Sequence, residues 1–209
     1  MGIQSNLIFI VLSVLAIVSK YTSPNNLYRL FKLLPILLLI ILVASFGDIQ
    51  GNPYTRAILA GLCFSIIGDS LLLFPVQFKL GLFSFLIGHI WYMLGFLSGD
   101  WSLPILPTLI ITILALGMFF QLYPTLEKLK IPVLVYIFMI AGMGITSFGR
   151  LETLQTFPTL IGAIGASLFM ISDGVLGWNK FKNPFHLAEG IILITYYSGQ
   201  WMISYSTLM

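Results

Sequence analysis

Apolar residues run through the chain in eight long segments, which short clusters of Pro, Gly, Asn and charged residues separate. A helix that crosses a membrane needs roughly 20 predominantly apolar residues, and fewer when polar groups at its ends reach the interface. The pattern therefore predicts an all-α, polytopic membrane protein with eight transmembrane helices in one bundle. They cover approximately residues 4–20, 29–46, 55–74, 80–98, 103–123, 131–148, 157–178 and 185–207.

The connections between these segments are short, so the pattern predicts one transmembrane helical domain over residues 1–209. Composition supports this, because 58% of the residues are hydrophobic and 8% are charged, whereas about a quarter of a typical soluble chain is charged. A soluble domain is excluded. The formal net charge is +3, but the basic residues are scattered singly or in pairs without a basic face, which argues against nucleic acid as a partner.

Basic residues are divided unevenly between the two sides of the predicted bundle. The odd-numbered connections and their flanks hold Lys20, Arg29, Lys32, Lys79, Lys128, Lys130, Lys180 and Lys182, and the even-numbered ones hold Arg56 and Arg150. Cytoplasmic connections of membrane proteins are enriched in Lys and Arg. This division predicts that both termini face away from the cytoplasm, and the short connections favour a bacterial inner membrane.

Two lone carboxylates interrupt the apolar segments, Asp69 in residues 55–74 and Asp173 in residues 157–178. Each lies five residues before the end of its segment, which places both about 7 to 8 Å inside the cytoplasmic boundary at the helical rise. Ionisable residues inside a membrane are costly and usually mark functional sites. We expect the two to face each other or a shared cavity, one protonated as an acid and the other ionised as a base. The alternative is a structural polar clamp between helices.

A shift of the chain by 104 residues onto itself places Asp69 on Asp173. The same shift aligns Gly61 with Gly165, Ile67 with Ile171, Leu72 with Leu176, Tyr92 with Tyr196 and Gly95 with Gly199. Four predicted helices separate the two copies. A duplication of this kind would make the halves parallel repeats about an axis along the membrane normal, with the site between them.

Two basic side chains are further candidates for the site. His89 is either a site residue or a buried histidine bonded to a carbonyl. A metal set built from His89 and the two aspartates lacks a recognisable ligand spacing, so the sequence predicts no metal. Lys32 is either a ligand for a lipid phosphate at the cytoplasmic surface or a snorkelling lysine that sets the topology.

Polar residues near the aspartates complete the set of candidates. Tyr136 lies about five residues into the segment 131–148, at the depth expected for the two carboxyls. Tyr197 and Gln200 share a helix face, because they are three residues apart, and they predict a polar stripe that lines a cavity. Tyr196 lies in the same segment. Ser172 precedes Asp173 and is a candidate to orient its carboxylate.

Several of these residues together resemble one known family. The Gly68-Asp69 pair, Gly88-His89 with Tyr92, Tyr136, Ser172-Asp173, Asn179 and Tyr196-Tyr197 with Gln200 are similar to the pattern of the YhhN-like lysoplasmalogenases. The resemblance extends over nearly the whole chain. One departure concerns the family's Lys-Pro pair, since two leucines separate Lys32 from Pro35 here.

The resemblance implies hydrolysis of the vinyl ether bond of a lysoplasmalogen, giving a fatty aldehyde and glycerophosphoethanolamine or glycerophosphocholine, without a cofactor. The partners would be the lysophospholipid substrate and membrane lipids. Cleavage begins with protonation of the β-carbon and ends with attack by water, which suits Asp69 and Asp173 as acid and base. The substrate-binding candidates are Lys32, His89, Tyr92, Tyr136, Ser172, Asn179, Tyr196, Tyr197 and Gln200.

Two other classes of function use the same residues. A proton-coupled transporter of lipids or small molecules would relay protons through the aspartates at a site between parallel halves. The acids are expected near one surface, whereas transporters of this kind bind at the midplane. A metal-dependent amidase or ester hydrolase is the third class.

Overall fold

A computed structural model of the protein describes residues 2–22 and 25–209, and this part of the chain forms eight long α-helices. The helices are α1 (Ile3–Thr22), α2 (Asn25–Phe46), α3 (Pro53–Leu72), α4 (Phe78–Phe96), α5 (Ile105–Leu122), α6 (Lys130–Leu154), α7 (Phe157–Phe181) and α8 (Ala188–Tyr205). Short 3₁₀ turns η1 (Pro75–Gln77), η2 (Tyr123–Thr125) and η3 (Glu127–Leu129) lie in two of the connections. The all-α bundle predicted from the sequence is confirmed.

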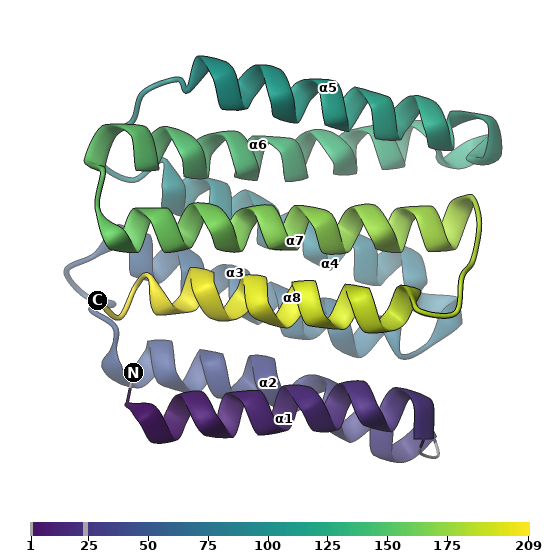
Figure 1. Cartoon of the computed structure of the whole chain (residues 1–209), viewed down its shortest axis with the longest axis horizontal. Coiled ribbons are helices and arrows are strands. Elements are labelled where there is room, and N and C mark those ends of the chain that lie inside the picture. Colours follow the sequence, from purple (N-terminus) through teal and green to yellow (C-terminus); the bar gives the residue numbers. More distant parts are fainter. Residues whose placement is uncertain (1, 23–24) are drawn as a thin grey trace.

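Helices α1 to α7 are each long and apolar enough to cross a membrane, and the chain is an integral, multi-pass membrane protein. The remaining helix, α8, has 18 residues and carries Tyr196, Tyr197 and Gln200, all of them buried. Its buried polar residues make α8 less hydrophobic than α7, which it runs alongside (Figure 1).

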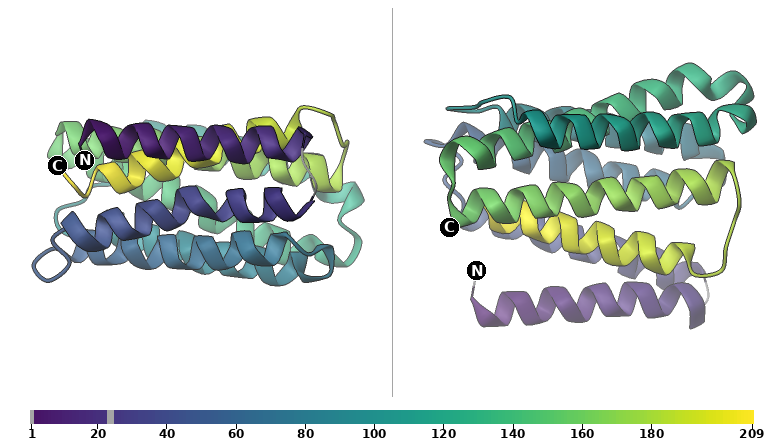
Figure 2. Two further views of the ribbon diagram at one scale, coloured as in Figure 1. Left: turned by 90° about the horizontal axis from the view of Figure 1, so that it is seen from below. Right: turned by 45° about the horizontal axis from the view of Figure 1, so that its top comes forward.

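The axes of all eight helices are aligned, and consecutive helices run in opposite directions, so that both termini lie at the same end of the bundle (Figures 1 and 2). Helices α3 and α7 both begin at this end and run away from it. Because Asp69 and Asp173 lie in the second half of these two helices, the carboxylates are brought toward the end of the bundle opposite the termini.

The two aspartate-bearing helices begin at strong local signals. Asn52 precedes α3, and its side chain accepts a hydrogen bond from the Tyr54 amide at 3.0 Å. Thr156 precedes α7 and forms a reciprocal capping box with Thr159. A proline follows each cap within the first two helical positions, where its missing N–H costs nothing. These caps define where α3 and α7 start.

Close packing between α7 and α8 depends on two glycines. A Cβ added to Gly165 would lie 2.8 Å from the Gly199 carbonyl oxygen, and one added to Gly199 would lie 2.8 Å from the Gly165 carbonyl oxygen. Small residues at a helix interface allow such backbone contact. This contact sets the position of α8 and therefore of Tyr196.

An aromatic cluster fills the space between α4, α7 and α8. The Phe169 ring lies 5.3 Å from the ring of Tyr196 and 4.8 Å from that of His89, measured between centroids. Phe85 meets Tyr196 edge to face at 5.9 Å. Such pairs restrict the orientation of each ring, so the side chains of Tyr196 and His89 are held rigidly beside the two aspartates.

Candidate active site

A polar chamber of about 660 Å³ opens between α2, α3, α7 and α8. Asp69 and Asp173 both line it, so the structure places them on a shared cavity, one of the two arrangements expected from the sequence. The other charged residues of its wall are Lys20, Arg29, Lys32, Lys180 and Glu189.

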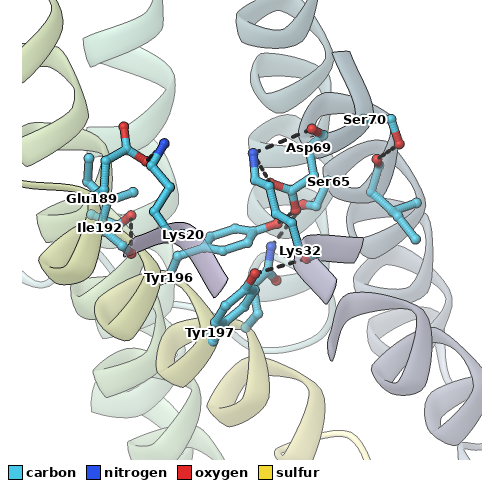
Figure 3. A network of polar contacts seen from close by, with 12 residues as sticks. Lys20, Lys32, Ser65, Asp69, Ser70, Glu189, Ile192, Tyr196 and Tyr197 are labelled. Atoms are coloured by element: carbon cyan, nitrogen blue, oxygen red, sulfur yellow. Dashed lines mark hydrogen bonds and ion pairs between the residues drawn. The ribbon is translucent and has the colours of Figure 1, made fainter. Parts of the chain in front are cut away.

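Asp69 forms a buried ion pair. Lys32 Nζ lies 3.3 Å from Asp69 Oδ1, and the Tyr196 hydroxyl donates a hydrogen bond of 2.6 Å to Oδ2. Asp69 is 2% exposed and Lys32 7% exposed. Figure 3 shows Tyr196 and Tyr197 extending from α8 toward this pair, and the Tyr197 hydroxyl donates to the Lys32 carbonyl oxygen at 2.9 Å. The isolated carboxylate in the sequence therefore has a cation and a phenol as partners.

The position of Lys32 differs from both alternatives drawn from the sequence. Lys32 is the eighth residue of α2, about 10 Å along the helix from its first residue. Its ammonium group points into the bundle toward Asp69 instead of snorkelling to the surface. The physical reason is the carboxylate on α3, which offers an ion pair where two unpaired charges would each be costly.

Asp173 has a different set of partners. The Tyr136 hydroxyl donates to Asp173 Oδ2 at 2.8 Å, and His89 Nε2 lies 3.2 Å from the same oxygen. This second contact lacks hydrogen-bond geometry, so Nε2 has no hydrogen-bond partner among the described residues. On the other side of the ring, Nδ1 lies 2.5 Å from the Phe85 carbonyl oxygen. Because a carbonyl oxygen only accepts, Nδ1 carries a proton, and Nε2 is the nitrogen that faces Asp173.

The two alternatives for His89 are thus combined in one side chain. It is 1% exposed, it is bonded to a carbonyl, and it also contacts Asp173. The equal depth of the two aspartates in the membrane stays a prediction, but their distances from the helix ends differ. Asp69 lies three residues before the end of α3 at Leu72, and Asp173 lies eight residues before the end of α7 at Phe181. These separations are about 4.5 and 12 Å, because α7 continues beyond its apolar segment.

One partner of each aspartate is related to the other by the shift of 104 residues. Tyr136 follows Lys32 by 104 residues, as Asp173 follows Asp69, and each donor contacts the aspartate of its own half. The second partner comes from the opposite half in both cases, Tyr196 of α8 for Asp69 and His89 of α4 for Asp173. This arrangement supports the predicted four-plus-four duplication.

A second polar network lies beside Asp69, away from the chamber. The Tyr92 hydroxyl donates to Gln200 Oε1 at 2.6 Å, and Gln200 Nε2 donates to Ser65 Oγ at 2.9 Å. All three side chains are completely buried. Neither Tyr92, Tyr197 nor Gln200 lines the chamber. The polar stripe expected to line a cavity instead joins α8 to its neighbours, because Gln200 bonds to Tyr92 of α4 and Ser65 of α3, and Tyr197 bonds to the backbone of α2.

Ser172 and Asn179 line the chamber, but their hydrogen bonds serve the α7–α8 pair. Ser172 Oγ donates to the Ile192 carbonyl oxygen of α8 at 3.0 Å, so it holds two helices together and does not orient Asp173. Asn179 Oδ1 accepts from the Phe185 amide at 3.1 Å. Asn179 therefore shapes the connection between α7 and α8.

Sequence reasoning missed the residues around the mouth of the chamber. Lys20 Nζ lies 3.3 Å from Glu189 Oε2, and the Tyr21 hydroxyl accepts a hydrogen bond from the Gly190 amide at 2.8 Å. Arg29 also lines the chamber. The available signal was Glu189, the only acid in residues 185–207. For Lys20 and Arg29 the sequence pattern indicated a role in topology alone.

Within residues 2–22 and 25–209, no group of three His, Cys, Asp or Glu side chains is arranged to hold a metal ion. The chemistry that the site offers is that of carboxyl, imidazole, phenol and ammonium groups in a largely buried chamber. Such groups can donate, accept and stabilise charge at a substrate that enters the chamber.

Comparisons with known proteins identify relatives along most of the chain. The sequence profile of the YhhN family matches residues 27–207. Lysoplasmalogenase TMEM86A of Homo sapiens is 31% identical over 195 residues, covering 90% of this chain and 80% of that protein. Lysoplasmalogenase TMEM86B of Homo sapiens is 32% identical over 163 residues, covering 74% and 65%. An uncharacterised membrane protein, YhhN, of Escherichia coli O157:H7 is 29% identical over 198 residues, covering 90% and 91%. No solved structure matches the chain.

Proposed function

Because the chain belongs to the YhhN family, we propose that it is a lysoplasmalogenase, a hydrolase that cleaves the vinyl ether bond of a lysophospholipid. Relatives of about this length carry that name. The observation that carries the proposal is the placement of Asp69 and Asp173 on one polar chamber, each with different partners. Vinyl ether hydrolysis requires an acid and a base, and two aspartates whose neighbouring groups differ can take these two roles.

Asp69 is the base of the proposed pair. The Lys32 ammonium and the Tyr196 hydroxyl both donate toward its carboxylate, and charge-assisted donors of this kind stabilise the ionised form. A fixed anion on the chamber wall stabilises a cation that develops during the reaction. The same carboxylate can take a proton from the attacking water.

Asp173 is the acid. Its neighbours are a neutral phenol, Tyr136, and a histidine whose Nε2 has no hydrogen-bond partner among the described residues. Asp173 Oδ2 and His89 Nε2 are close enough for one proton to pass between them, since catalytic contacts in empty sites are often longer than those in the complex. This pair can therefore carry the proton that the substrate needs.

The proposed reaction is balanced in atoms and protons. The acid Asp173 protonates the β-carbon of the vinyl ether, whose double-bond electrons form the new C–H bond and leave an oxocarbenium ion. Water attacks this cation to form a hemiacetal and gives a proton to Asp69. Asp173 then removes the hemiacetal hydroxyl proton, while Asp69 returns its proton to the departing glycerol oxygen. One water is consumed, and the products are a fatty aldehyde and a glycerophospho-alcohol.

The mouth of the chamber suits the phosphate of the headgroup. Lys20, Arg29 and Lys180 lie on its wall, and basic side chains near a membrane surface attract lipid phosphates. Lys32 is occupied by Asp69, so we assign it to the support of the base and not to the headgroup. This changes the role that the sequence suggested for Lys32.

The test uses purified protein and two lysolipids that differ only at the first glycerol linkage. We expect aldehyde release from the alkenyl lipid, none from the saturated alkyl ether, and aldehyde that carries deuterium on the carbon next to the carbonyl when the reaction runs in D₂O. Asp69→Asn and Asp173→Asn should each lower turnover about 100-fold or more, with binding of the uncleaved ether retained. The control is Asp100→Asn, an exposed aspartate in the α4–α5 connection.

Full turnover by both chamber variants would refute the assignment of the aspartates. Proton-coupled movement of an unaltered lipid across proteoliposomes, without aldehyde, would point to the transporter class instead.

A further inference from the structure

A second, apolar chamber of about 430 Å³ lies between α4, α5, α6 and α7. Phe78, Asp173 and Leu176 line both this chamber and the polar one. The two chambers therefore adjoin at Asp173. Of the two carboxyls proposed for catalysis, only that of Asp173 lines both chambers. Asp69 lines the polar chamber alone.

The apolar chamber opens sideways, toward the lipid-facing surface of the bundle. Ile110 and Leu114 of α5 are 49% and 64% exposed, and Ile171 of α7 is 51% exposed, although all three line the chamber. Hydrocarbon can enter through such an opening without crossing water. The deeper wall includes the part-buried or buried residues Met118, Ile137 and Met170.

Two glycines of α7 keep this chamber open beside Asp173. A Cβ added to Gly174 would meet no heavy atom of the described residues within 4 Å. A Cβ at Gly177, one turn further along, would meet only Leu122 and Met118 side chains at 3.6 and 3.8 Å. Gly174 and Gly177 both line the chamber. Neither glycine is needed for close helix packing, in contrast to Gly165 of the same helix, so the room they leave calls for another explanation.

We propose that the apolar chamber binds the hydrocarbon chain of the lysolipid, and that Gly174 keeps the path from this chamber to Asp173 open. The inference rests on the proposed function and extends it to the substrate's orientation. A lysolipid has a polar headgroup and an apolar chain, and the vinyl ether joins them. The polar chamber, Asp173 and the apolar chamber follow one another in the same order as the headgroup, the vinyl ether and the hydrocarbon chain. This placement also explains why Asp173 gives the proton to the alkenyl carbon, while Asp69 acts on the water.

The first test fills the space at Gly174 in the full-length protein. Gly174→Leu should lower kcat/KM for a long-chain alkenyl lysolipid about 10-fold or more, because lost contacts in an apolar pocket cost at least this much. A short-chain alkenyl lysolipid should show a clearly smaller loss, because less of its chain passes Gly174 into the chamber. The matched control is Gly117→Leu on α5, since Gly117 is exposed, lies outside the chamber wall and has equal room for a Cβ. Equal losses for both chain lengths, or none in Gly174→Leu, would overturn the proposal.

The second test does not depend on catalysis. The probe is a saturated alkyl-ether lysolipid with a photoreactive diazirine near the end of its chain, and labelled positions are mapped by mass spectrometry. In the wild type we expect labelling of Met118, Ile137 and Met170 that excess unlabelled alkyl-ether lysolipid abolishes, and in Gly174→Leu the loss of this labelling. Competed labels confined to other helices would contradict the chain site. A protein that shows the expected labels but releases no aldehyde would refute the proposed function and leave the chain site standing.

Discussion

At the residue scale, the described part of the chain contains two lysine–carboxylate pairs in opposite environments. Lys32 and Asp69 have side chains that are 9% and 3% exposed, whereas those of Lys20 and Glu189 are 32% and 35% exposed, at the same separation of 3.3 Å. Loss of one partner from a buried pair leaves an uncompensated charge, whereas water replaces the partner of an exposed charge. The two pairs therefore form a matched comparison within one protein.

Lys32→Met should lower the free energy of unfolding by about 3 to 5 kcal/mol. The double variant Lys32→Met with Asp69→Asn should lose less than the sum of the two single losses, because it leaves no unpaired buried charge. Lys20→Met and Glu189→Gln should each cost less than about 1 kcal/mol. Unfolding in mixed detergent micelles measures all of these values. Additive losses in the buried pair would show that Lys32 and Asp69 do not stabilise each other.

At the element scale, α8 is positioned by the backbone of α7. The carbonyl oxygen of each of Gly165 and Gly199 lies against the other glycine, where a Cβ would not fit. Ser172 adds a hydrogen bond to the Ile192 carbonyl oxygen. Two tyrosines of α8 donate hydrogen bonds to other helices, Tyr196 to the Asp69 carboxylate and Tyr197 to the Lys32 carbonyl oxygen. Packing between α7 and α8 thus determines the geometry around a residue of α3.

Gly165→Ala should destabilise the protein by about 1 to 3 kcal/mol, because the new methyl group meets backbone atoms that cannot move aside. It should also lower turnover, since a displaced α8 carries Tyr196 away from Asp69. Gly117→Ala is the control, because a Cβ there meets open space. The measurements are thermal unfolding in detergent and aldehyde release. Unchanged values for Gly165→Ala would show that α7 and α8 are not in such close contact.

At the scale of the whole molecule, the eight helices place both termini at one end (Figure 1). The polar chamber lies toward the other end, where α3 and α7 end. The excess of Lys and Arg lies at the chamber end, in the helix ends and connections where α1, α3, α5 and α7 finish. We propose that this end faces the cytoplasm, because cytoplasmic connections are enriched in these residues. The lysolipid would then be cleaved at the cytoplasmic leaflet.

Cysteine labelling in whole cells tests this orientation. In a Cys63→Ser background, which removes the single native cysteine, Asp100→Cys lies in the α4–α5 connection and Asn183→Cys in the α7–α8 connection. A membrane-impermeant maleimide should label position 100 in intact cells and position 183 only after permeabilisation. The reverse pattern would place the chamber on the outer face. Cells that carry only Cys63→Ser provide the background signal.

The sequence by itself determined the class of fold, the number of helices and the family. Apolar length and the low share of charged residues do not depend on tertiary contacts, so the helices could be predicted although their ends could not. Residues such as Gly68-Asp69 and Ser172-Asp173 indicated the YhhN family, which the comparison confirms. The two aspartates were identified as candidates because any charge inside hydrocarbon requires an explanation.

Only the tertiary structure decided which partners those candidates have. Lys32 and Asp69 are 37 residues apart in the chain, and Tyr196 and Asp69 are 127 apart, so no periodicity within one helix relates them. Tyr92 and Gln200 bond to each other inside the bundle instead of lining a chamber. The physical reason is that a sequence pattern predicts which face of a helix is polar, whereas the neighbour of that face depends on how closely helices approach, as Gly165 and Gly199 allow.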